Sequence, residues 1–126
     1  MNGKQGTILI VDDEKNVRYV VRKMLSSEYI VLEAMDGDVA VDMARKEKPD
    51  LILMDIMMPK TDGYSVTSIL KTDDVTKHIP VVMLTALSQE LNKKFAETMG
   101  ADGYITKPFT QHDLLDNISR LMKSAK

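Results

Sequence analysis

Two kinds of apolar pattern alternate along the chain. Short continuous apolar runs are typical of strands that are buried on both faces of a sheet. They occupy residues 7–11, 29–34, 51–54, 80–86 and 102–106. In other segments apolar residues recur at intervals of three and four, the spacing of one face of an amphipathic helix. These segments are 17–25, 39–44, 66–70, 91–99 and 114–122. The pattern predicts strands and helices in strict alternation.

Two helix boundaries are marked by residue type. Thr110 and Asp113 approximate a capping box, with aspartate in place of the usual glutamate. Gly100 stands where a helix ending at Met99 would need a left-handed residue. Both signals agree with the helices predicted from the periodicity.

Alternating strands and helices predict an α/β fold. Parallel strands need crossover connections, and these place helices on both faces of a doubly wound sheet. The 126 residues leave only short loops and contain no linker, repeat or low-complexity run. We therefore expect one domain over 1–126, with its core at about 7–122.

Composition narrows the possible functions. The chain is 44% hydrophobic and carries a net charge of −2 without a basic stripe, so direct binding to nucleic acid is not expected. It has no cysteine, which excludes disulfides and thiolate metal sites and suits a cytoplasmic protein. The apolar segment near the N-terminus is too short for a signal peptide or for insertion into a membrane.

Polar residues stand at the ends of the predicted strands. They are Asp12 and Asp13 after the first strand, Asp55 after the third, Thr85 in the fourth and Lys107 after the fifth. Parallel strands share a direction, so these side chains are expected at one edge of the sheet. Ligands of open α/β sheets bind beyond that edge.

The residue types at this edge indicate metal and phosphate chemistry. Clustered carboxylates repel one another unless a cation is present. Oxygen ligands without histidine or cysteine favour Mg²⁺. Lys107 and Thr85 could join the metal in holding a phosphoryl group. No glycine-rich loop is present to bind a nucleotide, so ATP is not an obvious donor.

Each residue also has an ordinary structural explanation. An acidic pair after a strand often lies at a helix N-terminus, and a lone aspartate there is commonly a turn residue. Thr85 or Lys107 taken singly would more often be a structural residue or a solvated charge. The joint placement at four strand ends favours one shared site.

Four motifs resemble the response-regulator receiver domain of two-component signalling. They are "ILIVDDE" (8–14), "DLILMDIMMPKTDG" (50–63), "VVMLTA" (81–86) and "GADGYITKPF" (100–109). The resemblance covers about residues 7–122. It implies a flavodoxin-like (βα)5 fold with strand order 2-1-3-4-5, the order known for flavodoxin and for receivers of this kind.

The resemblance implies a role for each polar residue. Asp55 matches the phosphoacceptor, and Lys107 matches the lysine that contacts the phosphoryl group. Asp12 and Asp13 match the acidic pair that binds Mg²⁺, with Asp13 the more direct ligand and Asp12 acting through water. Asp55 itself and the backbone carbonyl of Met57 would complete the metal site.

The resemblance also implies a switch. Thr85 matches the switch hydroxyl, which moves toward the phosphoryl group, and Tyr104 matches the aromatic residue that then turns inward. The Lys107–Pro108 bond matches one that is typically cis. The altered surface would involve the fourth helix, the fifth strand and the fifth helix, and would bind a downstream protein. The thin apolar stripe of the fourth helix suits a loosely held element.

Two variable positions of the family bear on the lifetime of the phosphorylated state. Here they are Met57 and Leu87, which cannot orient a water molecule for hydrolysis. We therefore expect a long-lived aspartyl-phosphate. Replacing Met57 by Asn and Leu87 by Glu together should speed its hydrolysis by about tenfold or more.

The expected function is that of a signalling protein rather than a conventional enzyme, with a sensor histidine kinase or phosphotransfer protein as its partner. One alternative is a Mg²⁺-dependent phosphohydrolase; its usual second aspartate, two residues after the nucleophile, is replaced by Met57. The other is an interaction module that has lost phosphorylation. The ending "SRLMKSAK" begins no second domain, which favours a free-standing receiver.

Overall fold

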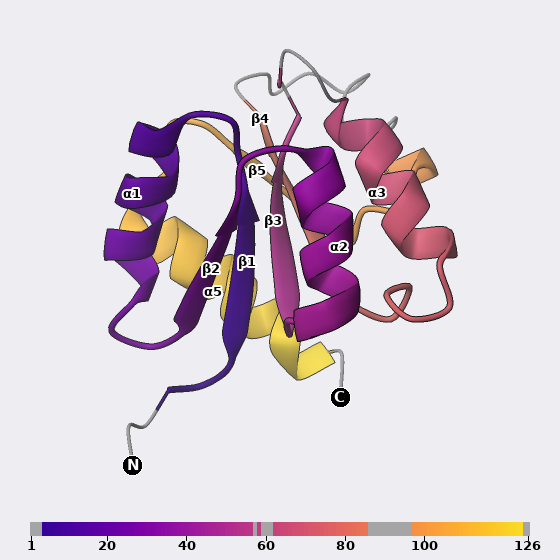
Figure 1. Ribbon diagram of the computed structural model, residues 1–126. Coiled ribbons are helices and arrows are strands. Elements are labelled where there is room, and N and C mark those ends of the chain that lie inside the picture. The colour runs from indigo at the N-terminus through magenta and orange to yellow at the C-terminus, as the bar shows by residue number, and fades with distance from the viewer. Residues whose placement is uncertain (1–3, 57, 59–61, 86–96, 125–126) are drawn as a thin grey trace.

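The computed structural model describes residues 4–56, 58, 62–85 and 97–124, which form one parallel sheet with helices on both faces (Figure 1). The strands are β1 (Thr7–Val11), β2 (Ile30–Ala34), β3 (Leu51–Asp55), β4 (Val81–Thr85) and β5 (Gly103–Thr106). Their order is β2-β1-β3-β4-β5, and every neighbouring pair is parallel. The expected α/β class and strand order are confirmed.

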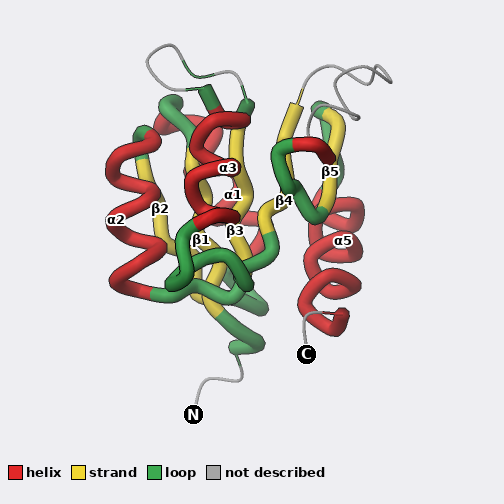
Figure 2. The backbone as a smooth tube through the Cα atoms, turned by 90° about the vertical axis from the view of Figure 1, so that its right-hand side faces the viewer, coloured by secondary structure: helices red, strands yellow, loops and turns green. Residues whose placement is uncertain are grey.

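The helices lie in two layers. They are α1 (Lys15–Leu25), α2 (Gly37–Glu47), α3 (Gly63–Thr72) and α5 (Gln111–Ser124). Figure 2 shows α2 and α3 on one side of the sheet and α5 on the other, and α1 shares the layer of α5. Most of the helix predicted over 91–99 lies outside the described residues.

The inner strands contribute side chains to both layers of the core, because successive strand residues point to opposite faces. Ile52 and Met83 pack in the layer with α2 and α3, whereas Leu53 and Leu84 pack in the layer with α1 and α5. All four are fully buried, and each such side chain stabilises the fold by about 1.5–3 kcal/mol. The ends of the inner strands are therefore held firmly from both sides.

Both predicted helix boundaries are confirmed. Thr110 N donates to Asp113 Oδ2 at 3.1 Å, and Asp113 N donates to Thr110 Oγ1 at 3.0 Å, which completes the capping box before α5. Gly100 has φ +99°, a conformation that glycine adopts without the steric cost of a Cβ atom.

Candidate functional site

The predicted site residues meet at the carboxyl edge of the sheet. Asp12 directly follows β1, and Asp55 and Thr85 are the last residues of β3 and β4. Lys107 directly follows β5. The strand order places β1, β3 and β4 side by side, so residues far apart in sequence become neighbours.

Three carboxylates form the centre of this site. Asp12, Asp13 and Asp55 each offer an oxygen, and these oxygens lie within 4.8 Å of one another. Asp12 and Asp55 are buried, with exposed fractions of 0% and 3%, whereas Asp13 is exposed. Buried carboxylates so close together require compensation by positive charge or hydrogen bonds.

Lys107 supplies part of that compensation. Its Nζ lies 3.2 Å from Asp55 Oδ1 and 3.9 Å from Asp12 Oδ2. The first distance is that of a hydrogen-bonded ion pair, and the second is too long for a hydrogen bond. One ammonium therefore faces two buried carboxylates and pairs closely with Asp55.

One carboxylate oxygen of Asp12 lacks a hydrogen bond from the described residues. Its Oδ1 accepts from Glu14 N at 2.8 Å, but among the described residues its buried Oδ2 receives no hydrogen bond. Burial raises the pKa of Asp12 to about 6, and the charges of Asp55 and Asp13 add to this, against the opposing effects of the Glu14 N–H and Lys107. A buried carboxylate oxygen without a donor, next to two more carboxylates, fits a hard divalent cation such as Mg²⁺.

The residues predicted to act as a switch, Thr85 and Tyr104, lie at the end of β4 and on β5. Thr85 is 2% exposed, and its carbonyl accepts from Lys107 N at 2.6 Å, which links the ends of β4 and β5. Tyr104 on β5 is partly buried and packs against the core layer that contains α2 and α3. The predicted cis bond between Lys107 and Pro108 is present.

Two predicted positions lie outside the described residues. They are Met57, whose carbonyl is the expected further metal ligand, and Leu87, the second position expected to govern phosphoryl lifetime. Both assignments stay predictions.

Sequence reasoning missed Gly63, which packs against the backbone of Asp55, the predicted nucleophile. An added Cβ at Gly63 would lie 2.4 Å from the carbonyl oxygen of Asp55 and 2.9 Å from the Cα of Ile56. Only glycine allows the start of α3 to approach the end of β3 so closely. The sequence signal was the "TDG" that follows the strand, where Asp62 caps α3 by accepting from Tyr64 N at 3.0 Å.

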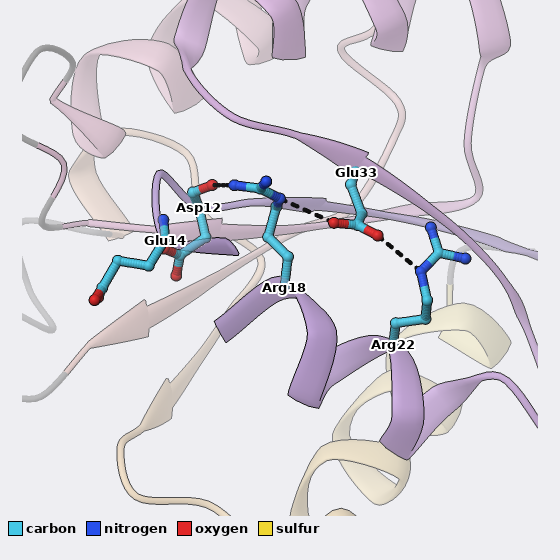
Figure 3. Close-up of polar contacts among 5 residues, drawn as sticks. All are labelled: Asp12, Glu14, Arg18, Arg22 and Glu33. Atoms are coloured by element: carbon cyan, nitrogen blue, oxygen red, sulfur yellow. Dashed lines mark hydrogen bonds and ion pairs between the residues drawn. The ribbon is translucent and has the colours of Figure 1, made fainter. Parts of the chain in front are cut away.

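Sequence reasoning also missed Arg18 on α1. Its Nη1 donates to the main-chain carbonyl of Asp12 at 2.8 Å, and its Nε donates to Glu33 Oε1 at 2.9 Å (Figure 3). An arginine in an amphipathic helix is ordinarily a solvated charge, and nothing in the pattern distinguished this one.

None of the helices in the described part of the chain combines the length and hydrophobicity that crossing a bilayer requires.

The sequence matches the family model described as "Response regulator receiver domain" over residues 8–119. It is 43% identical over 116 residues to chemotaxis protein CheY of Halobacterium salinarum, covering 91% of this chain and 95% of that protein. It is 42% identical over 117 residues to response regulator PleD of Caulobacter vibrioides, covering 92% of this chain but 26% of PleD. The chain thus corresponds to nearly all of one relative and to about a quarter of the other.

Solved structures share the fold. One is the receiver domain of a sensor histidine kinase from Pseudomonas aeruginosa, described with a magnesium ion coordinated in its active site cleft. The two are superimposed with a TM-score of 0.86 and 31% sequence identity, over 94% of this chain and 98% of that one.

Proposed function

Because the chain belongs to the response regulator receiver domain family, and is therefore a phosphoacceptor signalling domain, we propose that Asp55 is the residue that accepts the phosphoryl group. The donor is a phosphohistidine on a sensor histidine kinase or phosphotransfer protein. The observation that carries this assignment is the position of Asp55: it is a buried carboxylate at the end of β3, with Lys107 Nζ at 3.2 Å and two more aspartates beside it.

In the proposed reaction an oxygen of Asp55 attacks the phosphorus of the phosphohistidine. The new O–P bond forms as the P–N bond breaks, and the imidazole leaves with the electron pair of that bond. Lys107 neutralises charge on the transferring group from the side of β5. Burial of Asp55 keeps the attacking oxygen in one orientation, which favours transfer by positioning.

Asp12, Asp13 and Asp55 would hold Mg²⁺, with the carbonyl of Met57 as a further ligand. When bound, the ion would neutralise negative charge on the carboxylates and on the phosphoryl group. The buried Asp12 Oδ2, which receives no hydrogen bond from the described residues, supports this proposal, as does the magnesium ion in the related receiver from Pseudomonas aeruginosa.

The phosphoryl group would act through Thr85 and Tyr104 on the surface formed by the fourth helix, β5 and α5. Thr85 adjoins the ends of both β4 and β5, so a shift of its hydroxyl can reach β5 directly. A downstream protein would read this surface. Because phosphohistidine donors are made with ATP, the reaction belongs in the cytoplasm, where the domain relays a signal and turns over no metabolite.

The test is incubation with a small phosphodonor, with and without Mg²⁺, followed by intact-mass measurement. We expect one Mg²⁺-dependent phosphoryl adduct on the parent protein and none on Asp55→Asn. The matched control is Asp38→Asn, which makes the same change at an exposed carboxylate on α2 and should leave the adduct unchanged. Undiminished phosphorylation of Asp55→Asn would exclude the assignment. Catalytic turnover of the donor without an adduct would favour a phosphohydrolase, and no reaction would favour an interaction module.

A further inference from the structure

The loop between β1 and α1 carries both members of the acidic pair, Asp12 and Asp13. The N-cap residue of α1 does not fix this loop through its side chain. Glu14 is the N-cap residue of α1, and its side chain makes no capping hydrogen bond. The main-chain N–H of Asp12 is fixed by Ala34 O at 3.1 Å, which anchors the start of the loop. The peptide group that joins Asp12 to Asp13 needs another partner.

Arg18 is that partner. Its Nη1 donates to the carbonyl oxygen of Asp12, which belongs to the peptide that leads into Asp13. The Arg18 side chain is 14% exposed, so this contact is largely shielded from water. Figure 3 shows the guanidinium of Arg18 between Asp12 and Glu33.

The guanidinium is itself held in place by Glu33 on β2. Glu33 accepts from Arg18 through Oε1 and from Arg22 through Oε2, at 2.9 and 2.7 Å (Figure 3). Burial alone would raise the pKa of Glu33, but the hydrogen bonds and charges of Arg22 and Arg18 outweigh it and hold that pKa below its usual range. Glu33 lies opposite Ile10 in the pairing of β2 with β1, so the carboxylate that holds Arg18 is fixed to the sheet.

We propose that Arg18 is a positioning residue for the acidic site: it orients the Asp12–Asp13 peptide, so that both carboxylates point toward a common cation. This inference rests on the proposed Mg²⁺ site. Arg18 would contact neither the ion nor the phosphoryl group. Groups that orient metal ligands from behind typically change metal affinity about 10–100-fold when they are removed.

Whether replacement of Arg18 raises or lowers the Mg²⁺ affinity distinguishes a positioning role from a purely electrostatic one. Removing a positive charge near a cation site strengthens cation binding if charge alone matters. Removing an orienting hydrogen bond weakens it. Arg18→Ala is therefore expected to weaken Mg²⁺ binding about tenfold. The loss of its positive charge alone would strengthen Mg²⁺ binding instead. Arg18→Lys should also weaken it, because one ammonium lacks the fork of donors that reaches both Asp12 and Glu33.

Arg22 supplies the matched control. It shares the ion pair with Glu33 and lies on the same helix, but its Nε donates to Glu33 and not to the loop that carries the acidic pair. Arg22→Ala should lower stability without changing Mg²⁺ affinity. If Arg18 merely ties α1 to β2, both alanine variants would affect Mg²⁺ binding alike.

The experiment is a Mg²⁺ titration followed by amide NMR on the parent protein and on Arg18→Ala, Arg18→Lys and Arg22→Ala. The metal-free spectra show whether each variant is folded. At saturating Mg²⁺, phosphorylation of the Arg18 variants by a small donor should recover to the parent rate. Unchanged or tighter Mg²⁺ binding by both Arg18 variants, or equal weakening in Arg22→Ala, would overturn the inference while the proposed function stands. A parent protein that neither binds Mg²⁺ nor accepts a phosphoryl group would overturn both.

Discussion

At the scale of single residues, Asp12 shows how a functional site opposes stability. Its folded-state pKa of about 6 lies above the ordinary 3.8, so the folded protein binds this proton more tightly than the unfolded chain does. As pH rises through the window between these values, the unfolded state loses the proton first, and stability is lost. Above about pH 6 the metal-free protein carries the full penalty, on the order of 2–3 kcal/mol.

Asp12→Asn should therefore stabilise the metal-free protein at pH 7.5 by on the order of 2 kcal/mol and much less at pH 4.5. Urea unfolding in a chelating buffer at both pH values measures this. Asp38→Asn controls for loss of a surface charge. A stability advantage of Asp12→Asn over the parent that is constant or smaller at the higher pH would show that the burial of Asp12 is not the cause.

At the scale of elements, the site depends on how closely α3 approaches β3. The contact is between backbones: the carbonyl of Asp55 occupies the space that a Cβ on Gly63 would need. Flexible side chains can move aside, but the end of a strand buried in both core layers cannot move without disturbing its neighbours. The position of Asp55, the proposed nucleophile, is thus coupled to the first turn of α3.

Gly63→Ala should cost about 1–3 kcal/mol of stability and slow phosphorylation of Asp55, because the end of β3 must shift. Chemical unfolding and the rate of adduct formation measure the two effects. Ser65→Ala, an exposed change two residues along the same helix, removes the hydrogen bond from Ser65 Oγ to Asp62 Oδ2 at 3.2 Å; it should cost at most about 1 kcal/mol of stability and leave the rate of phosphorylation unchanged. Parent-like behaviour of Gly63→Ala in both assays would show that the loop relaxes freely.

At the scale of the whole molecule, the proposed switch requires the carboxyl edge of the sheet to communicate with the surface around β5. In that switch Thr85 would be the point of connection, since its carbonyl accepts from Lys107 N and it lies opposite Thr106 in the pairing of β4 with β5. Tyr104 lies on the same strand as Thr106. A ligand at the edge can shift an equilibrium between two states only if it binds them with different affinity, and the Thr85 hydroxyl would provide that difference.

Thr85→Ala should still accept a phosphoryl group on Asp55 but should not change the environment of Tyr104. Thr85→Ser keeps the hydroxyl and should restore the change. NMR spectra with and without a phosphoryl mimic provide the comparison. Parent-sized shifts around Tyr104 in the alanine variant would rule out this route.

The sequence by itself predicted the described strands and helices and the residues that meet at the carboxyl edge of the sheet. Continuous apolar runs marked the strands to within one residue at each described end, because strands buried on both faces exclude polar side chains. The Thr110–Asp113 capping box and the left-handed Gly100 could be predicted because helix caps depend on residues that are close in sequence. Asp12, Asp55 and Lys107 were found together because parallel strands end at one edge. The strand order came from the resemblance to receivers, since alternation alone does not specify it.

Tertiary structure decided which side chains support the site. Gly63 matters because two backbones meet there, and Arg18 matters because α1 packs beside β2 and thereby places its guanidinium between Glu33 and the Asp12 carbonyl. That Asp12 Oδ2 is buried and receives no hydrogen bond within the described part of the chain likewise depends on how the surrounding elements pack. The spacing of apolar residues in the sequence indicates which face of a helix or strand is buried. Contacts of a few ångströms between elements distant in sequence depend on how the packed layers meet, so only the folded chain shows them.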